Sequence, residues 1–221
     1  MPYTQIQFSD HSASLESGKI KYYPNFIKDG DNKYNSIIKS IPWDQGVYNM
    51  YGKQVYTPRL LWAMRDEDTD ISKEYNVTDS SVWNEMMGKL RIEVEEFLRK
   101  EYFSKKENMI EGLDLSSNFL RYAQLNYYRD GNDYIGWHTD KEMKKEDIIV
   151  SISLGTARRF QFMNIKDNNI KYELSLEPGS LLIFDTIVGK NEWKHRIPKQ
   201  LKLTNKSKDD DYGRINITFR T

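Results

Sequence analysis

The second half of the chain alternates apolar and polar residues in short runs, a pattern typical of β-strands. Turn residues such as Asp130-Gly131 and Pro178-Gly179 separate these runs. The runs are FLRYAQLNYY, DIIVSISLG, RFQFMNI, KYELSL, SLLIFD, WKHRI and RINITF. With GWHTD, which we also expect to be extended, they predict about eight strands.

Helical periodicity is confined to the first half of the chain. Apolar residues at helical spacing predict a short helix from Asn32 to Ile41, which Pro42 ends. A longer helix is predicted from about Val82 to Tyr102, with Ser81 or Asp79 as its N-cap. The polar N-terminal segment, roughly the first 18 residues, is expected to be loosely held.

Helices followed by strands predict an α+β fold. We expect a double-stranded β-helix, or jelly roll, with the N-terminal helices packed on one sheet. The 221 residues suit a single domain. Residues from about 1 to 117 would form an N-terminal extension with support helices, and residues from about 118 to 221 the jelly-roll core.

Composition limits the chemistry that the chain can carry. No run approaches the ~20 apolar residues of a membrane span, and the first residues lack a signal-peptide pattern, so we expect a soluble, intracellular protein without a membrane partner. Cysteine is absent, which excludes disulfides and thiolate ligands. Basic and acidic residues number 33 each, so the net charge does not attract nucleic acid. Residues 190–208 are locally basic, which indicates either a solvated surface or a phosphate-binding edge.

Two of the three histidines fit a metal site. His138 and Asp140 are two residues apart in GWHTD, so extended backbone would point both side chains the same way. That pair alone is a weak signal, because a lone His is more often structural. His195 follows several strand-like runs later, in EWKHRIP. Two His and one carboxylate are the ligand set of non-haem Fe(II) oxygenases, which leaves metal positions open for a cosubstrate and O2.

The last predicted strand carries an unusual polar face. In YGRINITFR, alternation puts the apolar residues on one side and these polar residues on the other: Arg214, Asn216, Thr218 and Arg220. Two buried guanidinium groups require an anion. The far carboxylate of 2-oxoglutarate would meet that requirement at Arg214 through two charge-assisted hydrogen bonds. Arg220 would contact the near carboxylate or hold Asp140 and the iron in place.

Together these motifs resemble the AlkB family of Fe(II)/2-oxoglutarate-dependent nucleic-acid dealkylases. The resemblance covers roughly residues 118–221, and the doubled Arg with Asn and Thr between is its most specific part. It implies that the iron ligands and catalytic centre are His138, Asp140 and His195. It also implies a set of 2-oxoglutarate contacts: Asn126, Tyr128, Arg214, Asn216 and Arg220.

The resemblance further implies an enzyme acting on alkylated DNA or RNA, as a single strand or a flipped base. The DNA-repair members, which the chain resembles most, demethylate 1-methyladenine and 3-methylcytosine and release formaldehyde, succinate and CO2. Fe(II) would be the cofactor, with 2-oxoglutarate and O2 as cosubstrates. We expect a monomer, and the sequence does not separate DNA from RNA.

Substrate contacts are expected outside the iron site. Glu142 matches an acidic residue near a cationic base, although an exposed surface role is also open. TPRLLWAMRD resembles the strand leading into a nucleotide-recognition lid, where Arg59 would contact the substrate and Trp62 would either stack on a base or lie in the core. Ala63-Met64-Arg65 departs here from the family's Tyr-Gly. Two lysines of the basic run would contact phosphates: Lys199 and Lys202.

Two other interpretations stay open. One is a 2-oxoglutarate oxygenase that acts on protein or on regulatory marks in RNA. The other is a jelly-roll binding module without catalysis. The intact His-Asp-His set and both arginines argue against a binding module, since loss of any one ligand would have favoured it.

Overall fold

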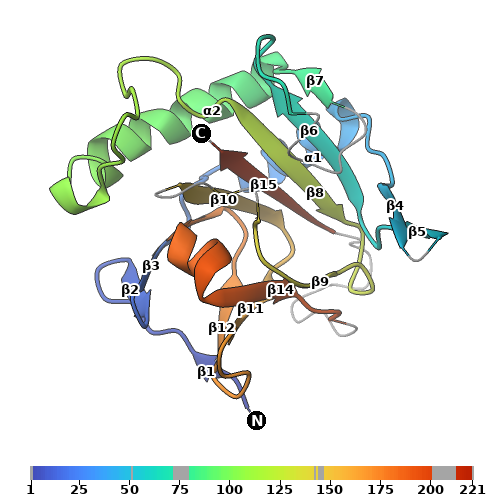
Figure 1. Cartoon of the computed structure of the whole chain (residues 1–221). Helices are drawn as coiled ribbons and strands as arrows, with labels where there is room; N and C mark the ends of the chain where they lie inside the picture. The colour runs from blue at the N-terminus through green and yellow to red at the C-terminus, as the bar shows by residue number, and fades with distance from the viewer. Residues whose placement is uncertain are drawn as a thin grey trace.

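The computed structural model describes residues 2–50, 52–71, 80–141, 143, 147–200 and 213–220. Two β-sheets face each other, and helices cover the outer face of the larger sheet (Figure 1). No helix among these residues is long and apolar enough to cross a membrane.

The larger sheet has eight strands, in the order β2-β3-β13-β10-β15-β8-β6-β7. Neighbouring strands are antiparallel, except for the parallel pair β6 and β7. The strands are β2 (Ser12–Leu15), β3 (Gly18–Tyr23), β6 (Leu60–Arg65), β7 (Ser80–Val82), β8 (Tyr122–Tyr128), β10 (Ile148–Gly155), β13 (Ser180–Asp185) and β15 (Arg214–Arg220). The N-terminal half therefore contributes four strands to the same sheet as the C-terminal half.

The smaller sheet has five strands, in the order β1-β12-β11-β14-β9. They are β1 (Thr4–Gln5), β9 (Ile135–His138), β11 (Arg158–Asn164), β12 (Lys171–Leu176) and β14 (Trp193–Ile197). A separate hairpin is formed by β4 (Val47–Met50) and β5 (Lys53–Tyr56), and it stands out beside the end of β6 (Figure 1).

Two helices and three short helical turns complete the described structure. They are α1 (Gly30–Ser40), α2 (Glu85–Phe97), η1 (Leu98–Tyr102), η2 (Lys106–Asn108) and η3 (Ile187–Asn191). Alternation along the strands of the larger sheet divides their side chains between two cores. Ile215, Ile217 and Phe219 of β15 pack with α1 and α2 in one core. The second core, with Phe160 and Phe162 of β11, lies between the two sheets.

The C-terminal half forms the predicted double-sheet arrangement, with eight strands from β8 to β15. Two local predictions are wrong. The polar N-terminal segment is held in place, because β1 pairs with β12 and β2 pairs with β3. The N-cap of α2 is Asn84, whose side chain accepts a hydrogen bond from the Met87 N–H at 2.9 Å. Ser81 lies in β7, paired with β6, so it does not cap the helix, and Asp79 lies outside the described residues.

Candidate active site

A cavity of about 570 Å³ lies between the two sheets. The larger sheet lines it with alternate residues of β8 and β15, and the smaller sheet with residues of β9 and β14. The described lining includes all five expected 2-oxoglutarate contacts beside the expected iron ligands. These five residues are Asn126, Tyr128, Arg214, Asn216 and Arg220.

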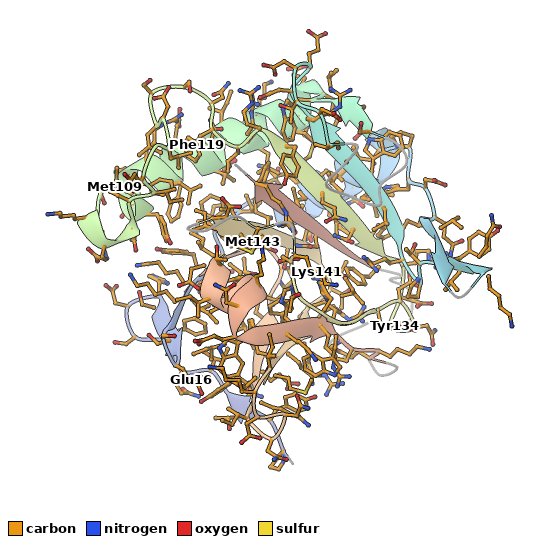
Figure 2. The ribbon with its side chains drawn as sticks, in the orientation of Figure 1. Glu16, Met109, Phe119, Tyr134, Lys141 and Met143 are labelled. Carbon is orange, nitrogen blue, oxygen red and sulfur yellow. The ribbon has the colours of Figure 1, made fainter. Side chains whose placement is uncertain are left out.

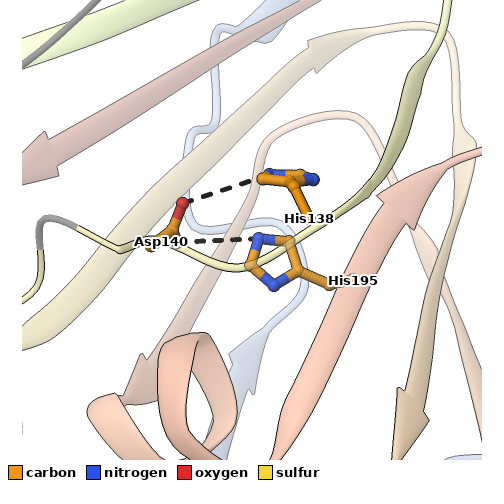
Figure 3. A group of neighbouring side chains, drawn as sticks. All are labelled: His138, Asp140 and His195. Atoms are coloured by element: carbon orange, nitrogen blue, oxygen red, sulfur yellow. Dashed lines mark ion pairs between the residues drawn. The ribbon is translucent and has the colours of Figure 1, made fainter. Parts of the chain in front are cut away.

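Three potential metal ligands meet on one side of the cavity (Figure 3). One ligand atom from each of His138, Asp140 and His195 lies within 4.8 Å of the others. The Asp140 carboxylate is 4.0 Å from Nε2 of His138 and 3.5 Å from Nε2 of His195. The sequence therefore predicted correctly which three residues come together.

Strand pairing brings these ligands together across a long separation in the chain. His138 ends β9, and its Cα partner on the antiparallel strand β14 is His195. Asp140 lies two residues after the end of β9, and its backbone N–H donates to the Gly189 carbonyl at 2.9 Å. The His138 ring is oriented by a 2.9 Å contact between Nδ1 and the Gly136 carbonyl. Backbone contacts thus orient the His138 ring and anchor the main chain of Asp140, whereas strand pairing alone places His195.

The protonation states at this cluster suit metal binding. Burial lowers the pKa of His138, and burial together with the charge of His138 lowers the pKa of His195 to about 3. Burial alone would raise the pKa of Asp140, but the charges of His195, Arg220 and His138 outweigh it and hold this pKa below its ordinary value. Two neutral imidazoles and one carboxylate are therefore available at pH 7, as a divalent metal requires.

Arg220 lies behind the metal cluster, as one of the two predicted roles requires. Its Nη2 is 3.4 Å from Oδ1 of Asp140, and both side chains are buried. The guanidinium thereby keeps the carboxylate ionised and limits its rotation. This contact favours the positioning role for Arg220 over a direct cosubstrate contact.

Arg214 has the properties of an anion-binding residue. It is 2% exposed, and its guanidinium carbon lies 5.3 Å from the centre of the Tyr128 ring. Nη2 donates to Oγ of Ser153 at 2.9 Å, whereas Nε and Nη1 have no hydrogen-bond partner among the described residues. Burial lowers the pKa of Arg214 to about 10, which leaves it charged at pH 7. A buried cation with two unpaired nitrogens fits the carboxylate of an organic acid.

Two amides of the cavity wall are held by protein partners. Asn216 donates through Nδ2 to Oγ of Ser151 at 2.6 Å. Asn126 accepts a 2.6 Å hydrogen bond at Oδ1 from Nε of Arg59. Arg59 itself is buried, so the structure places this predicted substrate residue against an expected cosubstrate contact.

The described residues fit the two groups that the ligand set implies. His138, Asp140 and His195 offer nitrogen and oxygen donors on one side, which suits Fe(II). Arg214 lies in the same cavity with donors to spare, which suits the far carboxylate of 2-oxoglutarate.

The expected substrate contacts have different outcomes. The predicted stacking role of Trp62 is wrong. Its ring packs against the core on the helix side of the sheet, and Nε1 donates to Oγ of Ser81 at 3.0 Å. Because neighbouring residues of β6 alternate, Leu61 faces the cavity and Trp62 does not. Lys199 lies outside the cavity lining, with Nζ 5.2 Å from the centre of the Tyr134 ring, which Figure 2 labels. Glu142 and Lys202 lie outside the described residues.

Sequence reasoning did not single out Arg158. It is 2% exposed, and its guanidinium carbon lies 5.4 Å from the centre of the Tyr128 ring, close to the distance of Arg214 from the same ring. Its Nη2 donates to the carbonyls of Asp133 and Pro198, both at 2.8 Å. Residue 158 precedes an alternating run and gives no periodic signal, so only its three-dimensional contacts identify it.

The family of this chain follows from its sequence and agrees with the site. A model of the 2OG-Fe(II) oxygenase superfamily matches residues 19–220, so the chain belongs to this superfamily. The AlkB resemblance within it is confirmed by two sets of relatives. The chain is 24% identical over 215 residues to the mouse (Mus musculus) "Alpha-ketoglutarate-dependent dioxygenase alkB homolog 3", covering 92% of this chain and 66% of that protein. It is 32% identical over 111 residues to the bovine (Bos taurus) "DNA oxidative demethylase ALKBH2", covering 46% of this chain and 37% of that protein.

The chain spans 64% to 66% of the length of the alkB homolog 3 proteins that it matches. Solved structures support the fold. "The structure of OsALKBH1" has a TM-score of 0.52 at 20% identity and covers 91% of this chain and 97% of that chain. A 2OG-Fe(II) oxygenase family oxidoreductase from Burkholderia pseudomallei has a TM-score of 0.53 at 12% identity and covers 91% of this chain and 84% of that chain. At these identities the likeness concerns the fold alone.

Proposed function

We propose that this chain is an Fe(II)- and 2-oxoglutarate-dependent dioxygenase that demethylates N-alkylated bases in DNA or RNA. The observation that carries the proposal is one cavity that holds both the His138, Asp140 and His195 cluster and the unpaired buried guanidinium of Arg214. The names of the alkB homolog 3 and ALKBH2 relatives support the class of reaction. 1-Methyladenine and 3-methylcytosine are the proposed substrates.

Each group of residues has a distinct task in this proposal. His138, Asp140 and His195 hold the iron, and Arg220 keeps Asp140 ionised and oriented. Arg214 holds the far carboxylate of 2-oxoglutarate, with Asn126, Tyr128 and Asn216 along the same wall. When bound, Fe(II) and 2-oxoglutarate would supply the oxidation of the methyl group, with O2 consumed and succinate, CO2 and formaldehyde released. The protein contributes orientation and electrostatics rather than a nucleophile.

The substrate must leave its stack to reach such a cavity, so single strands and unpaired lesions are the proposed preferred forms. The β4–β5 hairpin is the proposed recognition lid, because it leads into β6, which brings Leu61 to the cavity. The hairpin carries an exposed aromatic residue, Tyr56, which is 58% exposed and suits stacking on a base. Contacts of Glu142, Lys199 and Lys202 with the substrate also belong to the proposal.

The test is mass spectrometry of short DNA and RNA oligonucleotides, each with one 1-methyladenine or 3-methylcytosine. The oligonucleotides are incubated with the protein, Fe(II), 2-oxoglutarate and air, with His138→Ala as the control. We expect loss of one methyl group, dependent on every component and on His138. Succinate formation without any change in the oligonucleotides would contradict the proposed substrates. It would indicate an oxygenase that acts on a protein or on a different modified base. Equal demethylation by His138→Ala would overturn the iron site.

A further inference from the structure

Gln124 lines the cavity but belongs to neither the proposed iron site nor the proposed cosubstrate site. It lies on β8 two residues before Asn126, so both side chains share the cavity face. Its Cα partner on β15 is Thr218, and the next cavity-facing residue of β15 is Arg220, which contacts Asp140. Gln124 therefore lies beyond the cosubstrate contacts, towards the metal end of the wall.

The side chain of Gln124 differs from the other two amides that line the cavity. Asn126 is held by Arg59, and Asn216 is held by Ser151. Among the described residues, the Gln124 amide has no hydrogen-bond partner, although it is half-buried. A polar group in this position would gain from a ligand that supplies the missing partners.

The neighbours of Gln124 leave its amide room to meet a ligand. On β6 its Cα partner is Ala63, which is small, and on β15 its partner is Thr218. The Thr218 hydroxyl already donates to Oδ1 of Asn216 at 3.0 Å, so its hydrogen is not available to the Gln124 oxygen. The amide thus presents one donor and one acceptor side by side.

We propose that the Gln124 amide binds the N6 and N7 edge of a methylated adenine, so that the enzyme prefers 1-methyladenine to 3-methylcytosine. The inference rests on the proposed function and names the base that the same cavity selects. A glutamine amide matches this edge in both directions, since Nε2 donates to N7 and Oε1 accepts from the N6 amino group. In 3-methylcytosine the corresponding edge has an amino group beside a C–H, so the Nε2 donor would stay unpaired.

The experiment compares three single-stranded oligonucleotides of one sequence, with 1-methyladenine, 7-deaza-1-methyladenine or 3-methylcytosine at one position. We would measure kcat/KM for demethylation by the wild-type protein, Gln124→Leu and Gln124→Glu. Gln5→Leu is the matched control, because Gln5 is an exposed amide on β1, outside the cavity lining. Succinate formation without oligonucleotide and the melting temperature show whether each variant keeps its cosubstrate site and its fold.

For the wild type and Gln5→Leu we expect kcat/KM to fall about tenfold when N7 is replaced by C–H, and by a similar factor for 3-methylcytosine. Gln124→Leu should treat the three bases alike. Gln124→Glu should also be insensitive to N7, because a carboxylate has no donor.

Equal kcat/KM for 1-methyladenine and its 7-deaza analogue in the wild type would overturn the inference and leave the demethylase function standing. A 7-deaza penalty that persists in Gln124→Leu would overturn it as well, because another residue would then contact N7. If no base were demethylated while succinate formed, the proposed function itself would fail.

Discussion

Arg214 and Glu95 are both buried charges, and their partners separate a binding residue from a structural one. Glu95 is fully buried, but its carboxylate accepts from the Leu120 N–H at 2.8 Å and lies 3.5 Å from Arg99. Arg214 is almost as buried and keeps Nε and Nη1 unpaired within the described structure. Because a buried unpaired polar group destabilises the fold, the unpaired nitrogens of Arg214 support the proposed anionic ligand, whereas protein partners already satisfy Glu95.

This difference predicts the behaviour of Arg214→Ala. The substitution would remove the proposed bidentate, charge-assisted pair with 2-oxoglutarate, so we expect the cosubstrate concentration for half-maximal succinate formation to rise at least tenfold, about 1.4 kcal/mol or more. Arg159→Ala is the control, because Arg159 is an exposed arginine on β11. An unchanged 2-oxoglutarate dependence in Arg214→Ala would move the carboxylate site elsewhere.

Arg158 connects secondary-structure elements that are distant in sequence. From the first position of β11 it donates to the turn before β9, at Asp133, and to Pro198 after β14. Its guanidinium also lies near the Tyr128 ring on β8. The residue therefore links the two strands that carry the proposed histidine ligands to the strand that carries two proposed cosubstrate contacts.

For Arg158→Leu we expect both a lower melting temperature and a weaker apparent affinity for 2-oxoglutarate. The first effect comes from lost buried hydrogen bonds, and the second from a Tyr128 ring that is no longer held in place. Thermal unfolding and the 2-oxoglutarate dependence of succinate formation measure the two effects separately. A variant that is destabilised but binds 2-oxoglutarate normally would reduce Arg158 to a structural residue.

Elements also show where sequence reasoning succeeds and fails. Alternation predicted the two faces of β15 correctly, because both faces of that strand are buried. One face packs in the apolar core and the other lines the polar cavity, so a shift in register would bury the wrong side chains on each. The predicted N-cap of α2 is wrong. Ser81 and Asn84 are both residue types that cap helices, and only the pairing of β7 with β6 excludes Ser81. Trp62 was ambiguous for the same reason, since its face depends on the register of β6 with β8.

The cap itself can be tested. Asn84→Ala removes the acceptor of the Met87 N–H, and we expect it to lower the free energy of unfolding by about 1 kcal/mol. Urea denaturation measures the change, and succinate formation should stay normal because α2 lies on the far side of the sheet from the cavity. Asn84→Asp keeps a capping oxygen and should lose little stability. An equal loss for Asn84→Asp and Asn84→Ala would contradict the cap.

At the scale of the whole molecule, the site depends on both sheets at once. The smaller sheet supplies His138 and His195, whereas the larger one supplies Arg214 and Arg220. The sequence predicted these residues because each strand carries a local motif, and it could not predict how closely the sheets approach. That distance is set by the core between them, where Phe160, Phe162 and other large side chains pack.

In the proposed site, the metal and 2-oxoglutarate each contact one or both sheets. Binding of either should therefore stabilise the domain as a unit. At about a hundredfold excess over Kd, one ligand that binds only the folded state adds about 2.7 kcal/mol. For a domain of this size, that corresponds to a rise in melting temperature of about 5 to 10 °C. We therefore expect Mn(II), as an air-stable substitute for Fe(II), to raise the melting temperature, and 2-oxoglutarate to raise it further.

Two variants should affect the Mn(II) and 2-oxoglutarate shifts in melting temperature differently. His138→Ala should lose most of the Mn(II) shift, and with it the part of the 2-oxoglutarate shift that depends on metal. Arg214→Ala should keep the Mn(II) shift and lose the additional shift from 2-oxoglutarate, because in the proposed site its side chain binds the cosubstrate and not the metal. Differential scanning fluorimetry measures both shifts for the wild type and for each of the two variants. If His138→Ala and the wild type shifted equally with Mn(II), the metal would be binding elsewhere, and the coupling between the two sheets would not run through this cavity.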